Sequence, residues 1–126
     1  MLRCGIDLVK IARMEAISAA ILARFIQRIY TEAEQTQSKG NFEQLAGLFA
    51  AKEAASKALG TGIGKVAWRD IEILHKLSGE PTIHLHGHAK KVAAELGLDE
   101  WAVSISHENG MAIASVVALG SNSGDR

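Results

Sequence analysis

The chain has 126 residues, 48% of them hydrophobic and 22% charged, which suits one folded domain and excludes a disordered chain or a membrane protein. Lysine plus arginine equal aspartate plus glutamate at 14 each, so the bulk charge gives no argument for a nucleic-acid binder. No apolar run approaches the roughly 20 residues of a spanning helix, and Asp7 interrupts the N-terminal segment where a signal peptide would continue apolar. We therefore expect a cytoplasmic protein without membrane or nucleic-acid partners.

A β-strand is predicted at the N-terminus, because the side chains alternate in character over residues 2–11. The more apolar face of this strand consists of Leu2, Cys4, Ile6 and Leu8. Asp7 points away from that face, and an edge strand that turns this acid to water is the plain structural explanation. Cys4 is the only cysteine, which excludes an internal disulfide, and we expect it to be a small buried hydrophobe.

Three helices are predicted after this strand. Residues 11–25 carry apolar side chains at helical spacing. Thr31 and Glu34 have the spacing of a capping box at the start of a second, short helix. The third and longest helix is capped by Asn41 and ends at Gly60, which we expect in the left-handed conformation.

The second half of the chain is predicted to be mainly β-structure, with one short helix over residues 88–96. The expected strands cover residues 70–75, 82–86, 101–107 and 111–119. Asn109-Gly110 is a strong two-residue hairpin signal between the last two strands. Hairpins with helices clustered between them indicate an α+β fold, a mainly antiparallel sheet packed with a long central helix, in a single domain over residues 1–119. Residues 120–126 lack apolar side chains and are expected to be a disordered tail.

Charged residues and glycines gather toward the end of the long helix. Glu53 and Lys57 share one helix face, and Lys52 adds a neighbouring positive charge. The helix runs into Gly60-Thr61-Gly62, where backbone can approach a ligand closely. Taken alone, Glu53 and Lys57 form a solvated ion pair. Asp7 supplies a second carboxylate, and Mg²⁺ is usually held by one or two carboxylates plus substrate phosphates and water, so the set indicates a site for a metal ion and a phosphate ester.

A further group of polar residues ends the predicted strand before the last hairpin. Ser104 and Ser106 share a strand face, and His107 stands at a loop end, where functional residues gather. Taken alone, His107 is a polar residue at a strand end. Other histidines are close together in the sequence: His84, His86 and His88. A zinc site there lacks nearby thiolates, so a solvated strand face is the favoured interpretation.

With these motifs the chain closely resembles the holo-[acyl-carrier-protein] synthases, the small 4′-phosphopantetheinyl transferases. The resemblance runs from Gly5 to about Leu119 and is most specific from Phe49 to Gly64. It implies the fold of that family and transfer of the phosphopantetheine arm of coenzyme A to a serine of apo acyl carrier protein. The products are holo acyl carrier protein and adenosine 3′,5′-bisphosphate, and the pathway is fatty acid biosynthesis.

Residue roles follow from the same resemblance. Asp7 and Glu53 are expected to hold Mg²⁺ on the pyrophosphate, and Lys57 to stabilise the leaving phosphate. His107 is expected to contact the pyrophosphate or the metal shell. Further coenzyme A contacts are expected at Lys52, Gly60, Thr61, Gly62, Ser104 and Ser106. The proton acceptor for the carrier serine stays open, because Glu53 acting through a water would be a base weakened by the metal.

Partners are also implied. Carrier proteins are acidic, so basic residues of the first helical region are the natural docking charges, with solvated arginines as the plain alternative. The docking candidates are Arg13, Met14, Arg24, Phe25 and Arg28. The resemblance further implies a homotrimer with shared active sites, in which Asp7 and His107 face Glu53 of a neighbouring chain.

Two other functions compete with this one. A non-catalytic module that binds coenzyme A or carrier protein would lack a metal ligand or Lys57, and here all are present. A zinc hydrolase built on the clustered histidines lacks a carboxylate base at a characteristic spacing. The transferase is therefore the function that the sequence favours.

Overall fold

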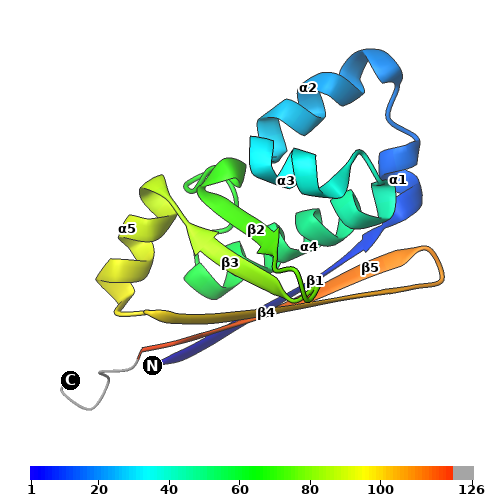
Figure 1. Cartoon of the computed structure of the whole chain (residues 1–126). Helices are drawn as coiled ribbons and strands as arrows, with labels where there is room; N and C mark the ends of the chain where they lie inside the picture. The colour runs from blue at the N-terminus through cyan, green and yellow to red at the C-terminus, as the bar shows by residue number, and fades with distance from the viewer. Residues whose placement is uncertain (121–126) are drawn as a thin grey trace.

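The computed structural model describes residues 1–120 as an α+β fold in which helices pack on one face of an antiparallel sheet (Figure 1). The strand order is β1-β5-β4, with β1 at Leu2–Lys10, β4 at Glu100–Glu108 and β5 at Met111–Leu119. The Asn109-Gly110 turn has φ values of 50° and 73°, the left-handed geometry of a two-residue hairpin. The predicted fold class and hairpin are confirmed.

A second, two-stranded antiparallel sheet lies beside the helices in Figure 1. It consists of β2 (Ile71–His75) and β3 (Pro81–Leu85) and follows a single 3₁₀ turn, η1 (Trp68–Asp70). The two strands pair along their whole length, with Ile73 opposite Ile83. This hairpin confirms the prediction for the middle of the chain.

Five helices are described within residues 1–120. They are α1 (Ile11–Glu15), α2 (Ala19–Ile29), α3 (Glu32–Ser38), α4 (Phe42–Leu59) and α5 (Gly87–Leu96). The single helix predicted over residues 11–25 is wrong, because the chain leaves the helix after Glu15 and Ser18 adopts an extended backbone as the N-cap of α2.

The predicted helix ends are confirmed. Thr31 and Glu34 form a reciprocal capping box at the start of α3. The Asn41 side chain accepts a hydrogen bond from the Gln44 amide at the start of α4. Gly60 ends α4 with a φ of 81°. Each of these signals depends on residues close in sequence, so tertiary packing did not override them.

The long helix α4 lies against the inner face of the three-stranded sheet. Its buried small residues are Ala46, Ala50, Ala51, Ala54, Ala55 and Ala58. The strand β1 approaches so closely that a Cβ at Gly5 would overlap the carbonyl oxygen of Ala54, so only glycine fits there. Asp7 follows Gly5 on the same face of β1, and it is therefore turned toward α4.

The opposite face of β1 corrects a prediction about the core. Leu2, Ile6 and Leu8 are 69%, 58% and 56% exposed, and Cys4 is exposed as well. The alternation was predicted, but the more apolar face is outside, because the helices all lie on the other side of the sheet in the described residues (Figure 1). Cys4 is consequently not the buried hydrophobe that was expected.

Two further expectations concern the ends of the molecule and the membrane. The tail predicted to be disordered lies, from residue 121 onward, outside the described residues, and Gly120 still donates its N–H to the carbonyl of Met1. Within residues 1–120, no helix combines the length and the apolar character needed to cross a membrane.

Candidate active site

Two carboxylates and an ammonium group come together between β1 and α4. The Lys57 Nζ donates to the carbonyl of Ile6 at 2.8 Å and to Asp7 Oδ1 at 3.2 Å. Burial raises the pKa of Glu53 above its ordinary value, the negative charge of Asp7 raises it further, and Lys57 opposes both. Glu53 therefore lies within electrostatic reach of both Asp7 and Lys57, and the two carboxylates of the cluster face only one ammonium group.

This cluster joins residues that are far apart in sequence. Lys57 follows Glu53 by one helical turn, so both side chains leave the same face of α4. Gly5 lets β1 lie directly on that helix, which brings Asp7 to it. Asp7 and Glu53 thus come together within one chain, which differs from the arrangement that the resemblance implies, in which Asp7 faces Glu53 of a neighbouring chain.

The donor set suits a hard cation. Asp7 and Glu53 offer carboxylate oxygens, which Mg²⁺ prefers. Burial first, and the negative charge of Asp7 second, raise the pKa of Glu53, and a bound cation would offset both effects. Within the part of the chain that the structure describes, no three His, Cys, Asp or Glu side chains converge as a metal site. The two carboxylates thus fit an ion whose other ligands come from a substrate and water.

His107 lies away from this cluster in the single chain. Its Nε2 donates to the carbonyl of Glu43 at 2.8 Å, in the first turn of α4, and its ring packs against Gly47. The ring lines a cavity of about 120 Å³ together with His75 and Pro81, at the turn of the β2–β3 hairpin. His107 therefore borders a cavity that a ligand can enter, and its predicted contact with the pyrophosphate or the metal shell stays a prediction.

Ser104 and Ser106 are exposed on the outer face of the sheet. They border a shallow cavity of about 150 Å³ with Ile6, Ile113 and Ser115. Asp7 faces α4 on the inner side of the same sheet, so one chain does not bring these serines to the carboxylates.

The glycine turn after α4 is compact and partly closed on itself. The amides of Thr61 and Gly62 both donate to the carbonyl of Ser56 at 3.2 Å. Gly62 has a φ of 67° and open space around the position of a Cβ, so a ligand can approach its backbone. This accessible backbone is compatible with the predicted ligand contact, and neither of the two amides is free to donate fully.

Arg3 is a basic residue beside this turn that sequence reasoning missed. Its Nε donates to the carbonyl of Ala58 at 2.9 Å, and its guanidinium occupies the place that a Cβ of Gly60 would need. The available signal was the alternation along β1, since Arg3, Gly5 and Asp7 share one face.

Lys52 is a correction to the predicted ligand contacts. Its side chain is fully buried and forms an ion pair with Glu34 at 2.8 Å. Its Nζ also donates to the carbonyls of Trp68, at 3.0 Å, and Ile71. All three N–H groups of the ammonium are therefore used inside the protein, and the expectation that Lys52 contacts coenzyme A is wrong for this structure.

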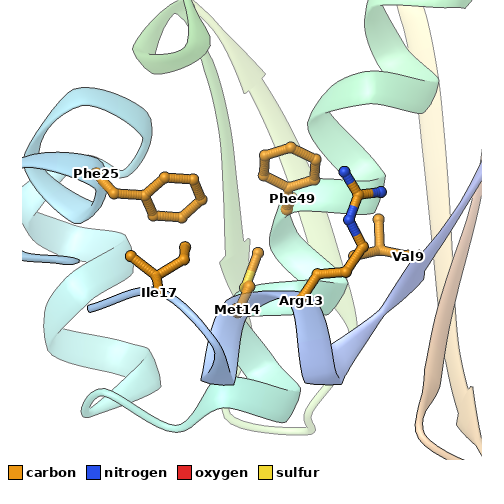
Figure 2. A pocket seen from close by; sticks show the side chains of 6 residues that line it. All are labelled: Val9, Arg13, Met14, Ile17, Phe25 and Phe49. Atoms are coloured by element: carbon orange, nitrogen blue, oxygen red, sulfur yellow. The ribbon is translucent and has the colours of Figure 1, made fainter. Parts of the chain in front are cut away.

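Three of the five predicted docking residues, Arg13, Met14 and Phe25, line a cavity of about 240 Å³ between α1, α2 and α4 (Figure 2). Figure 2 shows that this cavity is lined by Val9, Arg13, Met14, Ile17, Phe25 and Phe49. Phe25 stacks on Phe49 with ring centroids 6.2 Å apart. Arg24 and Arg28 are exposed on α2 and do not line the cavity. The cavity is a small apolar hollow with one guanidinium at its border.

Two of the three histidines considered for zinc, His84 and His86, have other partners. His84 Nε2 lies 3.0 Å from Thr82 Oγ1, and His86 Nε2 lies 3.0 Å from a carboxylate oxygen of Glu72. Burial alone would raise the pKa of Glu72, but hydrogen bonds from Thr31 and His86 bring it below its ordinary value. The geometry gives the zinc hydrolase no support.

Comparison with known proteins identifies the family to which this chain belongs. Residues 3–113 match the profile of the 4′-phosphopantetheinyl transferase superfamily, and the chain belongs to that family. A curated holo-[acyl-carrier-protein] synthase of Herpetosiphon aurantiacus is 42% identical over 127 residues, which cover 95% of this chain and all of that protein. Within the superfamily, the chain is therefore one of the holo-[acyl-carrier-protein] synthases.

Solved structures agree with this assignment. The holo-[acyl-carrier-protein] synthase of Helicobacter pylori in complex with coenzyme A has a TM-score of 0.83 and 37% identity, covering 92% of this chain and 99% of that one. The Bacillus anthracis enzyme in complex with coenzyme A (3′,5′-ADP) has a TM-score of 0.74 and 38% identity, covering 92% and 94%. The family fold predicted from the sequence is confirmed.

Proposed function

We propose that this chain transfers 4′-phosphopantetheine from coenzyme A to a serine of apo acyl carrier protein in a reaction that needs Mg²⁺. The observation that carries the proposal is the convergence of Asp7, Glu53 and Lys57 on one ligand-accessible edge of α4. Relatives of the same family are solved with coenzyme A bound, which supports that molecule as the donor. We further place the reaction in fatty acid biosynthesis and in the cytoplasm.

Asp7 and Glu53 would hold Mg²⁺ through their carboxylate oxygens. When bound, the ion supplies neutralisation of charge on the pyrophosphate of coenzyme A. Lys57 is half exposed, with 51% of its side chain accessible, so its ammonium can also meet an oxygen of the leaving phosphate. Glu53 has a raised pKa and could take the proton of the carrier serine through a water, which leaves the identity of the base to experiment.

Binding of coenzyme A is proposed at three places, of which the second and third meet at a cavity of about 480 Å³ lined by both Ser106 and His107. They are the turn Gly60-Thr61-Gly62, the cavity beside His107, and the outer sheet face at Ser104 and Ser106. Glu43, which holds His107, and Lys57 are about 21 Å apart along α4 at 1.5 Å per residue. A neighbouring chain would bring such separated contacts to one ligand.

A homotrimer with shared active sites is therefore part of the proposal. The outer sheet face presents apolar side chains to solvent, and contiguous exposed apolar surface marks interaction sites. Its large exposed members on β1 and β5 are Leu2, Ile6, Leu8, Ile113, Val117 and Leu119. Covering this face with a neighbouring chain would bury it and bring Ser104 and Ser106 toward that neighbour's α4.

Docking of acyl carrier protein is proposed at the cavity of Figure 2. Arg13 borders the cavity, while Arg24 and Arg28 lie exposed on the adjoining helix α2, so an acidic partner would meet positive charge around an apolar hollow. Met14 is buried and serves as part of the floor, whereas Phe25 is partly exposed and can contact an apolar side chain of the carrier.

Intact-mass spectrometry of apo acyl carrier protein tests the proposal. Incubation with this protein, coenzyme A and Mg²⁺ should add the mass of one phosphopantetheine group, and EDTA should prevent the gain. The single variants Asp7→Ala and Glu53→Ala should fold and fail to transfer. If a folded sample binds coenzyme A yet modifies no carrier protein, the non-catalytic binding module becomes the better description.

A further inference from the structure

The helix α4 is held on two sides by polar contacts of its basic residues. Toward β1, Lys57 bonds the carbonyl of Ile6 and the Asp7 carboxylate. Toward α3 and β2, Lys52 bonds Glu34 and two backbone carbonyls. Only the contacts of Lys57 belong to the site described above, so the contacts of Lys52 have another role.

The Glu34–Lys52 pair is completely buried and completely satisfied. Glu34 Oε1 accepts from the Thr31 amide at 2.8 Å and lies 2.8 Å from Lys52 Nζ. Glu34 Oε2 accepts from the Ile73 amide at 2.7 Å. Both side chains have no exposed surface. One carboxylate thus ties the start of α3 and the middle of β2 to the middle of α4.

Stability alone is a weak reason for such a pair. Removing two charges from water is costly, and a buried ion pair is often no more stabilising than apolar side chains of similar volume. What charge-assisted hydrogen bonds add is direction, because they are short and angle-dependent. The pair is therefore suited to fixing the position of an element.

The packing of α4 against its neighbours fixes the rotation of this helix only weakly. Its contact surface is largely alanine, and short side chains interlock little with their neighbours. Its close approach to β1 is made by backbone at Gly5 and Ala54. Alanine side chains by themselves permit a small rotation of the helix about its axis, and the three bonds of Lys52 oppose it at the middle of the helix. Nearer its ends, α4 accepts hydrogen bonds at the carbonyls of Glu43, Leu45 and Ala58 from the side chains of His107, Tyr30 and Arg3.

We propose that Glu34 and Lys52 are positioning residues that set the rotation of α4 and thereby hold Glu53 and Lys57 opposite Asp7. The roles of those three residues rest on the function proposed above, but the placement of the helix does not. Lys52 immediately precedes Glu53, so any rotation that Lys52 prevents would carry Glu53 with it.

The expected effect can be worked from helix geometry. A group about 5–6 Å from the helix axis moves by about 1 Å when the helix rotates by about 10°. A misplacement of about 1 Å in a reacting group can lower a rate by about 100-fold. Loss of the pair should therefore reduce kcat while the fold persists.

The double variant Glu34→Gln/Lys52→Met tests this role. Glutamine keeps the capping box with Thr31, and the two changes together leave no unpaired buried charge. We expect kcat to fall about 10- to 100-fold, with the KM for coenzyme A changed by less than about threefold. Nuclear Overhauser contacts between the Gly5 α-protons and the Ala58 amide should weaken, because they report the placement of α4 directly.

Leu98→Ala is the matched control for lost stability, since Leu98 is buried in the segment that follows α5, outside the site. It should lower Tm and leave kcat and the Gly5–Ala58 contacts unchanged. Unchanged kcat and contacts in the double variant would overturn the proposal. Changed contacts with unchanged kcat would show that Glu53 and Lys57 lack their proposed roles, which separates the two failures.

The single variant Glu34→Asp covers the case in which the double variant does not fold. It keeps both buried charges and shortens the carboxylate by one methylene, so the contact with Lys52 must lengthen or α4 must move, and a smaller loss of kcat in the same direction is expected. Wild-type kcat together with wild-type Gly5–Ala58 contacts in folded Glu34→Asp would also overturn the proposal.

Discussion

Replacing Gly5 with alanine would test whether the close packing of β1 on α4 holds Asp7 in the site. The new Cβ would overlap the carbonyl oxygen of Ala54 and lie 3.0 Å from the nitrogen of Ala58. Both are backbone atoms within a helix, so rotation of a side chain cannot relieve the overlap. The strand must move away from the helix instead.

The size of the effect follows from this displacement. Overpacking of a core contact costs about 1–3 kcal/mol, and 1 kcal/mol lowers the Tm of a domain of this size by about 3–6 °C. Asp7 lies two residues further along the same strand face and now stands 3.2 Å from Lys57. A shift of about 1 Å would break that contact, so we expect kcat to fall by about 10- to 100-fold.

The assay combines carrier modification by mass spectrometry at saturating substrates with thermal unfolding by circular dichroism at one fixed protein concentration. Gly40→Ala is the matched control, because Gly40 has a φ of 72° and no atom lies within 4 Å of the added Cβ. It should cost about 1–2 kcal/mol through backbone strain and leave kcat unchanged. A Gly5→Ala variant that loses stability but keeps wild-type kcat would refute the reasoning.

Further predictions concern the charges of the site and the two proposed interfaces. Because the folded state raises the pKa of Glu53, the folded chain binds this proton more readily than the unfolded chain. The free energy of unfolding that this group contributes therefore decreases as the pH rises from the ordinary pKa to the raised pKa. Glu53→Gln should raise Tm at neutral pH in EDTA, should leave Tm unchanged below the ordinary pKa, and should abolish transfer. Asp7→Asn should lower the pKa of Glu53 in a carbon-13 titration, and an unchanged pKa would contradict their proximity. Arg13→Glu should raise the KM for carrier protein about tenfold or more without affecting that for coenzyme A, whereas the same charge change at exposed Lys91 should affect neither. Ile6→Glu should give a monomer in light scattering and lose transfer, and an intact, active oligomer would exclude the outer sheet face as the interface.

The features that could be predicted from sequence are those decided by neighbouring residues. The capping box of Thr31 and Glu34 and the Asn109-Gly110 turn appear as expected, because their geometry depends on side chains only a few positions apart. The break between α1 and α2 carried a signal of the same kind in Ser18, an N-cap residue inside an otherwise helical pattern.

Other features depend on contacts that a periodic pattern does not contain. Alternation along β1 identifies two faces, but which face is covered depends on where α4 lies, and Gly5 rather than the leucines decides that. Lys52 stands beside Glu53 in sequence and suggested a shared ligand. Consecutive helix residues point about 100° apart, so Lys52 meets Glu34 while Glu53 stays near Asp7.

The three-stranded sheet separates the predicted ligand residues of one chain into two groups, one on each of its faces. Asp7 and Glu53 lie on the helix side, where burial raises the pKa of Glu53, and Ser104 and Ser106 lie on the side that no helix of residues 1–120 covers. A ligand as long as coenzyme A cannot pass through the sheet to reach both sides of one chain. A neighbouring copy whose carboxylates hold the ligand beside these serines would explain the exposed apolar face and the divided site together.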